Sequence, residues 1–220
     1  MQAPKLENLG VFAKWDDARE YLTDADPVLA RLFSLEPQPP KRLFGVFEGL
    51  IRAIIAQQIS NKVAFALWQK VWALTQNHLS LFTALSRSSL EDLRAIGLSQ
   101  TKAETIVRVV ERFESGQWSE EKLAAMDDAA LVSELTSMKG IGPWTATSVL
   151  IFGLGRPDVC PLDDFGIKTA LCRHYFSLQT PQNVMRKPHN KAVKLTVGKW
   201  APYRTVATVV LWHSLGNAPQ

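Results

Sequence analysis

The sequence predicts an all-α protein, and three observations favour that class. Signals for helix starts recur along the chain, including prolines that follow an aspartate or a glycine. No segment alternates apolar and polar residues as a half-buried strand does, and no internal repeat is present. The clearest pattern is a set of apolar residues that recur at helical spacing: Phe47, Leu50, Ile51, Ile54, Ile55 and Ile59.

Residues 7–34 are predicted to form two helices. Pro27 opens the second helix directly after Asp26, because proline suits the first position of a helix. Residues 35–43, with the sequence LEPQPPKRL, are rich in proline and are interpreted as a crossing between two lobes. One face of the first helix is formed by Trp15, Ala18, Tyr21 and Leu22.

The core helix at residues 44–59 ends in a polar cluster, Gln57-Gln58-Ile59-Ser60, and another helix follows at 62–75. Residues 80–126 are predicted to form three more short helices. Within them, Ser88-Ser89-Leu90-Glu91 is typical of a capping box, and the helix after Gly97 starts at Ser99 or Thr101.

The central segment is a helix, a tight turn and a second helix. The first helix ends near residue 138, and the turn is Lys139-Gly140-Ile141-Gly142. Two glycines permit a sharp turn, and Pro143 opens the next helix, which runs to about residue 152. Backbone amides after such a turn have no partner within the helix and lie at the positive end of its dipole. The turn is therefore a candidate phosphate site.

A loop then delivers two acids, Asp163 and Asp164, to the start of a helix at residues 165–175. Residues 177–190 are predicted to be a polar loop, and the last helix is expected from Pro202 to about Leu215.

Several other charged residues are expected to have structural roles. Asp127 and Asp128 lie where acids cap a helix N-terminus. Lys102 could touch a phosphate, but a solvated lysine is the preferred interpretation. Arg204, at the start of the last helix, is interpreted as the partner of a buried acid rather than of a phosphate.

The composition is that of a soluble globular protein with one core or two lobes sharing one. Of 220 residues, 46% are hydrophobic and 21% charged. No apolar run approaches the 20 or so residues that span a bilayer, and the first ten residues lack the apolar core of a signal peptide. Cys160 and Cys172 suit free thiols in a reducing compartment, so we expect a cytoplasmic protein, nucleoid-associated if bacterial.

The charge of the chain is concentrated near its C-terminus. Lys and Arg number 25 and Asp and Glu 21, so the net charge is 25 − 21 = +4. Residues 156–220 contribute 9 − 3 = +6, and residues 1–155 contribute 16 − 18 = −2. A basic bias suits non-specific contact with phosphates, although charge alone favours an ordinary solvated surface.

The central motif resembles one enzyme family. The sequence GIGPWTATSVL followed by PLDDFGIK is similar to the helix-hairpin-helix DNA glycosylases, and most similar to their alkylpurine branch, the 3-methyladenine DNA glycosylase II type. A G-x-G between helices is a weak signal, but the tryptophan, the downstream acid and their spacing make it specific. Three more segments resemble the family, FEGLIRAIIAQQIS, GLSQTKAETI and KWAPYRTVATVVLW, so the similarity spans most of residues 44–216.

The resemblance implies a two-lobed fold with the active cleft between the lobes. A helical barrel domain with the helix-hairpin-helix is expected at residues 44–156. A second helical domain is expected from both chain ends, residues 1–43 and 157–220. Larger members carry an additional N-terminal β domain, which we expect to be absent here.

The resemblance also implies an activity, that of a monofunctional DNA glycosylase in base excision repair. Such an enzyme flips an alkylated purine, 3-methyladenine or 7-methylguanine, out of the duplex and releases it by hydrolysis, leaving an abasic site. The second acid, Asp164, would be catalytic, since a carboxylate stabilises an oxocarbenium-like sugar and can orient the water. Asp163 would then serve as the helix N-cap.

Aromatic residues at family positions predict the base pocket. Trp144 and Trp212 would hold the cationic base through their ring faces, although each could equally be a core residue. Ser148 stands where some relatives carry a pocket tyrosine, so the shape of the pocket is left open. Trp144 also occupies the position of the lysine that forms a Schiff base in bifunctional relatives, which predicts base release without strand cleavage.

The resemblance implies DNA contacts at two places. Gln57, Gln58 and Ser60 correspond to the loop that enters the gap left by a flipped nucleotide, with Gln58 or Ser60 as the wedge. The alternative is a helix C-cap with no contact to ligand. In the turn, DNA-backbone contacts are expected from Lys139, Gly140, Gly142 and Thr145. Backbone carbonyls that would hold a monovalent cation are those of Thr136, Met138 and Ile141.

No other cofactor is expected. Two cysteines are too few for the iron–sulfur cluster of some relatives, and no His, Cys or carboxylate cluster has metal-ligand spacing. The expected partner is double-stranded DNA with alkylated bases, bound by a monomer that does not enter a membrane. Two alternatives are a non-catalytic helix-hairpin-helix DNA-binding module and a glycosylase of the same fold for deaminated or etheno bases.

Overall fold

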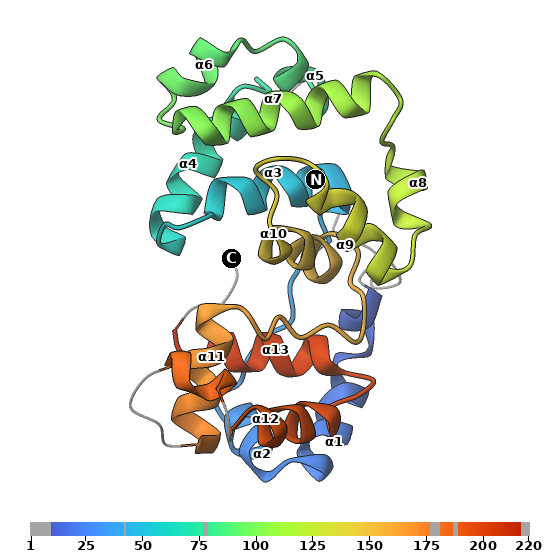
Figure 1. Ribbon diagram of the computed structural model, residues 1–220, viewed down its shortest axis with the longest axis vertical. Helices are drawn as coiled ribbons and strands as arrows, with labels where there is room; N and C mark the ends of the chain where they lie inside the picture. Colours follow the sequence, from blue (N-terminus) through green and yellow to red (C-terminus); the bar gives the residue numbers. More distant parts are fainter. Residues whose placement is uncertain (1–9, 42, 77–78, 177–180, 187–188, 217–220) are drawn as a thin grey trace. The chain divides into compact units, whose positions relative to one another are not determined.

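The computed structural model describes residues 10–41, 43–76, 79–176, 181–186 and 189–216 (Figure 1). Among these residues every regular element is helical and no strand is present, which confirms the all-α class. None of the described helices has the length and apolar character needed to cross a bilayer. The chain divides into two compact units, which we call the middle unit (Phe44–Leu154) and the terminal unit (Met1–Leu43 with Gly155–Gln220).

The middle unit consists of short helices packed around α3. Helix α3 contacts α4, α7, α8, α10 and the π-helical turn η3. The elements are α3 (Gly45–Ala56), α4 (Asn61–Ala73), α5 (Leu81–Ser86), α6 (Leu90–Ala95), α7 (Gln100–Glu114), α8 (Glu120–Ala124), α9 (Asp128–Thr136), α10 (Pro143–Ser148) and η3 (Val149–Gly153).

Helix α3 forms the core of the middle unit, as its apolar spacing predicted. Leu50, Ile51 and Ile54 are completely buried, and burying a side chain of this size contributes about 1.5–3 kcal/mol to folding. The turn η3 comes very close to this helix. A Cβ on Gly153 would lie 2.6 Å from the Gly45 carbonyl oxygen, so only glycine fits there.

Helix α4 is held to α3 partly by a cation–π contact. The Arg52 guanidinium carbon lies 3.9 Å from the ring centroid of Trp68 and 4.1 Å from that of Phe44. Glu48, one turn before Arg52, accepts a hydrogen bond from its Nε at 2.9 Å. The contact between Arg52 and Trp68 joins α3 to α4, the two helices that flank residues 57–60.

Local sequence signals define most of the helix starts in this unit. Ser89 forms a reciprocal capping box with Asp92, Ser99 caps α7, and Asp127 accepts from the Ala130 amide at 2.8 Å. The predicted helix starts at Ser99 and Asp127 are confirmed, and the capping box predicted within residues 88–91 is present one residue later, between Ser89 and Asp92. The start of α3 is different, because Glu120 of α8 accepts hydrogen bonds from its first amides, those of Val46 at 2.7 Å and Phe47 at 2.8 Å.

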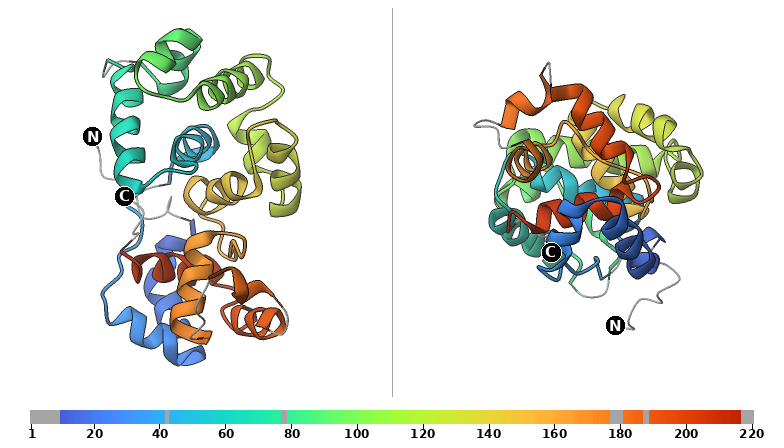
Figure 2. Two further views of the ribbon diagram at one scale, coloured as in Figure 1. Left: turned by 60° about the vertical axis from the view of Figure 1, so that its left-hand side comes forward. Right: turned by 90° about the horizontal axis from the view of Figure 1, so that it is seen from below.

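The terminal unit is built from helices of both chain ends around α13. Every residue of α13 from Thr205 to Trp212 is buried. Helix α13 contacts α1, α2 and α11 (Figure 1 and Figure 2). The elements are η2 (Gly10–Lys14), α1 (Trp15–Ala25), α2 (Pro27–Phe33), α11 (Phe165–Leu171), η4 (Cys172–Phe176), η5 (Pro181–Met185), α12 (His189–Gly198) and α13 (Arg204–His213).

Part of the terminal unit differs from the sequence prediction. The interval predicted as a polar loop contains the 3-10 helix η5 and the start of α12, and α12 itself was not predicted. Its buried face has only two apolar residues, Val193 and Val197, which is too few to give a helical pattern. Residues 177–180 and 187–188 of the predicted loop, and residues 7–9 of the first predicted helix, lie outside the described residues.

A buried carboxylate connects the two chain ends within the terminal unit. Asp26 caps α2 by accepting from the Val28 and Leu29 amides at 2.9 and 3.3 Å. It also accepts from Tyr175 Oη at 3.0 Å and from Trp200 Nε1 at 2.8 Å. Burial and the neighbouring carboxylate raise the pKa of the Tyr175 hydroxyl well above its ordinary value. Four donors satisfy this carboxylate, as a buried acid requires.

Candidate functional site

The candidate phosphate site lies in the middle unit, in the turn between α9 and α10, residues 137–142, which we call the hairpin. Helix α10 begins at Pro143, as predicted. Gly140 has φ of +100°, and a Cβ there would lie 2.2 Å from Thr105 Oγ1. Gly142 has φ of −96° and open space around it. Only Gly140 therefore needs to be glycine for the shape of the turn, while the open space around Gly142 would allow another molecule to approach its backbone.

Two side chains from distant parts of the sequence hold the hairpin. Gln57 Nε2 donates to the Gly140 carbonyl oxygen at 3.0 Å and to Thr145 Oγ1 at 2.9 Å. Arg108 donates to the Lys139 carbonyl oxygen at 3.3 Å and to Thr105 Oγ1 at 3.2 Å. An amide NH₂ has two hydrogens, so Gln57 directs both of them at the hairpin and its neighbour.

Residues 57–60 connect α3 to α4 and contain the two candidate wedge residues. Gln58 is exposed and has φ of +56°, a left-handed conformation uncommon for a residue other than glycine. Ser60 is also exposed, but it is the N-cap of α4 and accepts from the Val63 amide at 3.4 Å. The structure therefore gives Ser60 a role in the fold and presents Gln58 to solvent on a strained backbone.

Lys102 is not the solvated lysine that the sequence predicted. Its Nζ donates to the Ile55 carbonyl oxygen at 2.7 Å, in the last turn of α3. This contact satisfies a carbonyl that has no partner within the helix. Burial lowers the pKa of the Lys102 ammonium. The Lys102 ammonium group therefore supports the end of α3, next to residues 57–60.

Of the three carbonyls expected to hold a cation, those of Met138 and Ile141 lie in the hairpin and that of Thr136 belongs to the last residue of α9. Met138 and Ile141 are buried, and the Met138 carbonyl oxygen accepts from the Ile141 amide at 3.1 Å. The intervening carbonyls of Lys139 and Gly140 accept from side chains instead. Neutral oxygen donors of this kind fit a hard monovalent cation. Within the described residues, no group of three His, Cys, Asp or Glu side chains could hold a metal ion.

The candidate catalytic acid lies in the terminal unit, at the start of α11. Asp164 is half-buried and is the N-cap of the helix: its Oδ1 accepts from the Ile167 amide at 2.8 Å. The same oxygen accepts from the indole Nε1 of Trp212 at 2.8 Å. A carboxylate offers about four acceptor positions, so capping the helix is compatible with a second role.

Asp163 does not cap the helix, and this part of the prediction is wrong. The helix starts at Phe165, so the residue directly before it, Asp164, is the one whose side chain reaches the amides of the first turn. The Asp163 side chain is 95% exposed, and its Oδ1 lies 3.6 Å from Lys168 Nζ. An exposed ion pair at this distance is worth little, about 0–1 kcal/mol.

The two predicted base-holding tryptophans belong to different units. Trp144 lies in the first turn of α10 and is half-buried. Ser148, one turn later, is buried and donates to the Trp144 carbonyl oxygen at 2.9 Å. Trp212 belongs to α13 and is 9% exposed. The Trp212 indole N–H is thus directed at a carboxylate, a contact that could not be predicted from the sequence.

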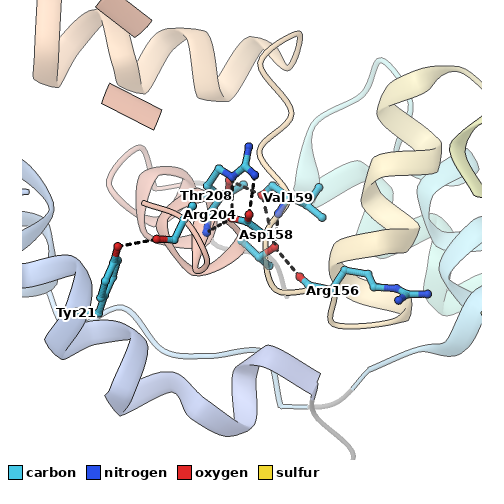
Figure 3. A network of polar contacts seen from close by, with 8 residues as sticks. Tyr21, Arg156, Asp158, Val159, Arg204 and Thr208 are labelled. Atoms are coloured by element: carbon cyan, nitrogen blue, oxygen red, sulfur yellow. Dashed lines mark hydrogen bonds and ion pairs between the residues drawn. The ribbon is translucent and has the colours of Figure 1, made fainter. Parts of the chain in front are cut away.

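The loop that leads to Asp164 is attached to the start of α13 (Figure 3). Arg204 donates through Nε and Nη2 to the two oxygens of Asp158, each at 2.6 Å. These hydrogen bonds lower the pKa of Asp158 and raise that of Arg204. Thr205 and Thr208 add hydrogen bonds from their hydroxyls to the Arg156 and Val159 carbonyls, at 2.6 and 3.2 Å. The interpretation of Arg204 as half of a structural pair is confirmed.

Cys160 lies in the same loop, and both cysteines are free thiols. Burial raises the pKa of the Cys160 thiol to about 11, so the thiol is protonated at neutral pH. A protonated, half-buried thiol is a poor nucleophile.

The chain is similar to known base excision repair proteins. The family model described as HhH-GPD superfamily base excision DNA repair protein matches residues 51–193. DNA-3-methyladenine glycosylase 1 of Schizosaccharomyces pombe is 30% identical over 170 residues, which cover 76% of this chain and 72% of that protein.

Two solved structures are also similar. The structure of the S. pombe 3-methyladenine DNA glycosylase Mag1 in complex with abasic DNA is 27% identical, with a TM-score of 0.78 and coverage of 93% of this chain and 98% of Mag1. A DNA-3-methyladenine glycosidase from Bacillus halodurans is 30% identical, with a TM-score of 0.68 and coverage of 90% of this chain and 89% of that one.

Proposed function

Because the chain belongs to the HhH-GPD superfamily of base excision DNA repair proteins, we propose that it is a monofunctional DNA glycosylase that releases alkylated purines from duplex DNA. The substrate class we propose is 3-methyladenine and 7-methylguanine, in keeping with the names of the relatives. The observation that carries the proposal is an aspartate, Asp164, whose Oδ1 is held at the start of a helix by two donors at 2.8 Å.

The chemistry requires little acid catalysis at the base. A purine alkylated at N3 or N7 carries a positive charge, so its glycosidic bond is weakened. When the C1′–N bond breaks, the bonding electrons go to the base, which leaves as a neutral molecule, and the positive charge passes to the sugar. Water then adds to C1′ and loses a proton, and the strand stays intact. The Asp164 carboxylate would stabilise the sugar cation and orient the water.

The absence of a lysine supports the monofunctional assignment. Trp144 stands at the motif position where bifunctional members of the family carry their amine nucleophile. An indole cannot form a Schiff base with C1′, so no route to strand cleavage is available at this position. Its ring face can instead attract a cationic purine, by about 2 kcal/mol when water is excluded.

The hairpin would bind the DNA backbone. Its contacts would come from the exposed Lys139 and from the amides of Gly140, Gly142 and Thr145. The relative Mag1 was crystallised with abasic DNA, which supports a DNA-binding surface in this chain. The carbonyls of Thr136, Met138 and Ile141 would hold a monovalent cation, which supplies a positive charge for a phosphate.

The wedge that fills the place of a flipped nucleotide is proposed to be Gln58. Its backbone holds a left-handed conformation at a cost of about 1–3 kcal/mol, and such strain concentrates at functional sites. Ser60 is used as a helix cap, so Gln58 is the better placed of the two candidates, and the neighbouring Gln57 is used as a support of the hairpin.

The test is base release from four duplexes, each with one lesion: 3-methyladenine, 7-methylguanine, hypoxanthine or ethenoadenine. The proposal predicts release of the two methylated bases, with strand breaks only after alkali treatment. Release of hypoxanthine or ethenoadenine alone would assign the enzyme to another lesion class. Covalent trapping by borohydride would contradict the monofunctional assignment, and DNA binding without any release would identify a non-catalytic module.

A further inference from the structure

Trp212 makes a contact that a base-holding ring does not need. Its indole N–H donates to Asp164 Oδ1 at 2.8 Å, within the contact between α13 and α11. The Ile167 amide donates to the same oxygen, also at 2.8 Å. A backbone donor and an indole donor therefore converge on one atom of the proposed catalytic carboxylate.

The close approach depends on Gly166. A Cβ at this position would lie 3.0 Å from Asp164 Oδ1, 3.0 Å from Trp212 Cδ1 and 3.1 Å from Trp212 Nε1. Each distance is shorter than ordinary van der Waals contact, so any larger residue must push the carboxylate and the indole away. Gly166 lies inside α11 and is not required by a left-handed backbone, since its φ is outside that region. Glycine at position 166 therefore leaves room for the contact between Trp212 and Asp164.

The indole is a rigid donor. Trp212 is 9% exposed and closes the buried stretch of α13 that starts at Thr205. The first turn of that helix is fixed by the Arg204–Asp158 pair, and Thr208 bonds to the loop that leads to the acid. A donor with so little freedom costs no reorganisation when charge develops on the substrate.

We propose that Trp212 is a positioning residue, which holds the Asp164 carboxylate in the orientation that faces the sugar, and that Gly166 is the space that permits this contact. The inference rests on the proposed function, in which Asp164 stabilises the sugar cation. It changes the role that the sequence indicated for Trp212, because the working group is the indole N–H rather than the ring face.

The substitution Trp212→Phe separates the two roles, because phenylalanine keeps an aromatic face and lacks the N–H. The probes are two duplexes that contain no base at the target position. One carries a tetrahydrofuran, a neutral sugar analogue, and the other a pyrrolidine, whose protonated nitrogen mimics the charge on the sugar in the transition state. Because neither analogue has a base, its affinity does not depend on stacking between a base and the Trp212 ring.

We expect the wild type to bind the pyrrolidine duplex more tightly than the tetrahydrofuran duplex. In Trp212→Phe this preference should fall about 10-fold or more while the affinity for tetrahydrofuran changes less than about 2-fold. Single-turnover release of 3-methyladenine and of 7-methylguanine should fall by the same factor, about 10–100-fold, because the carboxylate acts on the sugar. An unchanged preference, together with rate losses that differ between the two bases, would overturn the proposal in favour of base holding.

Gly166→Ala provides an independent variant, because it keeps both partners and only forces them apart. It should also lose the preference for pyrrolidine, and a retained preference would contradict the role of Gly166. Trp72→Phe on α4 is the matched control for a tryptophan-to-phenylalanine change and should behave as wild type. Thermal unfolding of each variant shows whether it is folded. If the wild type itself lacks the preference and releases no base, the proposed function fails, whatever the Trp212 variant does.

Discussion

Gln57 lies 83 positions before Gly140 in the sequence, yet its side-chain amide donates to the Gly140 carbonyl oxygen at 3.0 Å. The second hydrogen of the same amide is bonded to Thr145 Oγ1 at 2.9 Å. The loop that contains the proposed wedge is thereby attached to the hairpin proposed to bind phosphate. A substitution in the loop at residues 57–60 should therefore affect the hairpin as well.

Replacing Gln57 should weaken both the fold and the binding of DNA. Gln57→Leu removes two hydrogen bonds and should lower the free energy of unfolding by about 1–3 kcal/mol. The affinity for a duplex with a tetrahydrofuran site should fall as well, because the hairpin loses a support. Urea denaturation and fluorescence anisotropy measure the two effects. Normal DNA affinity in a destabilised variant would show that the hairpin holds its shape without Gln57.

The two glycines of the hairpin should respond differently to alanine. Gly140→Ala brings a Cβ into a severe clash with Thr105 Oγ1 and forces a left-handed backbone on alanine, so we expect a loss of several kcal/mol in stability. Gly142→Ala meets open space and should leave the melting temperature unchanged. If the Gly142 backbone approaches a phosphate, that variant should bind DNA more weakly. Equal melting temperatures for the two variants would contradict this account of the hairpin.

Gln58 offers a separate test of the wedge. Gln58→Gly removes the side chain and relieves the left-handed conformation, so stability should change by less than about 1 kcal/mol. Base release should nevertheless slow, because flipping a paired nucleotide costs a few kcal/mol that an inserted side chain offsets. The loss should be smaller on a mismatched lesion, which is easier to flip. Wild-type rates on paired and mismatched duplexes would exclude Gln58 as the wedge.

Cys160 should make stability depend on pH in the alkaline range. Folding raises the pKa of this thiol from about 9 to about 11, so the neutral form is favoured in the folded state. The stabilisation is complete below pH 9 and is lost as the pH rises to about 11. Over that window the wild type should lose about 2–3 kcal/mol more than Cys160→Ala. The raised pKa of Tyr175 adds an alkaline loss that is the same in both proteins and cancels in the comparison. Parallel curves for the two proteins would contradict the raised pKa of the Cys160 thiol.

The parts of the fold that the sequence predicted depend on neighbours in the chain. Asp127, Ser89 and Pro143 mark helix starts because a cap or a proline acts within three or four residues. The core helix α3 is visible because its own apolar residues repeat at helical spacing. Such signals need no knowledge of the rest of the molecule.

The parts that could not be predicted are contacts between segments far apart in the sequence. Glu120 caps the start of α3 through the amide of Val46, 74 residues earlier, and Lys102 caps its end through the carbonyl of Ile55, 47 residues earlier. The indole of Trp212 reaches an acid 48 positions away. Composition and periodicity do not encode which distant donor meets which acceptor. For the same reason the choice between Asp163 and Asp164 as helix cap required the first residue of α11 to be known.

The central claim is that the Asp164 carboxylate carries the reaction, and single-turnover release of 7-methylguanine from duplex DNA tests it most directly. Asp164→Asn keeps an oxygen that can cap α11 but removes the negative charge, so we predict a loss of at least about 100-fold in rate with DNA binding retained. The neighbouring Asp163→Asn changes the same charge on an exposed side chain and should release the base at the wild-type rate. Undiminished release by Asp164→Asn, or an equal loss in both variants, would contradict the account.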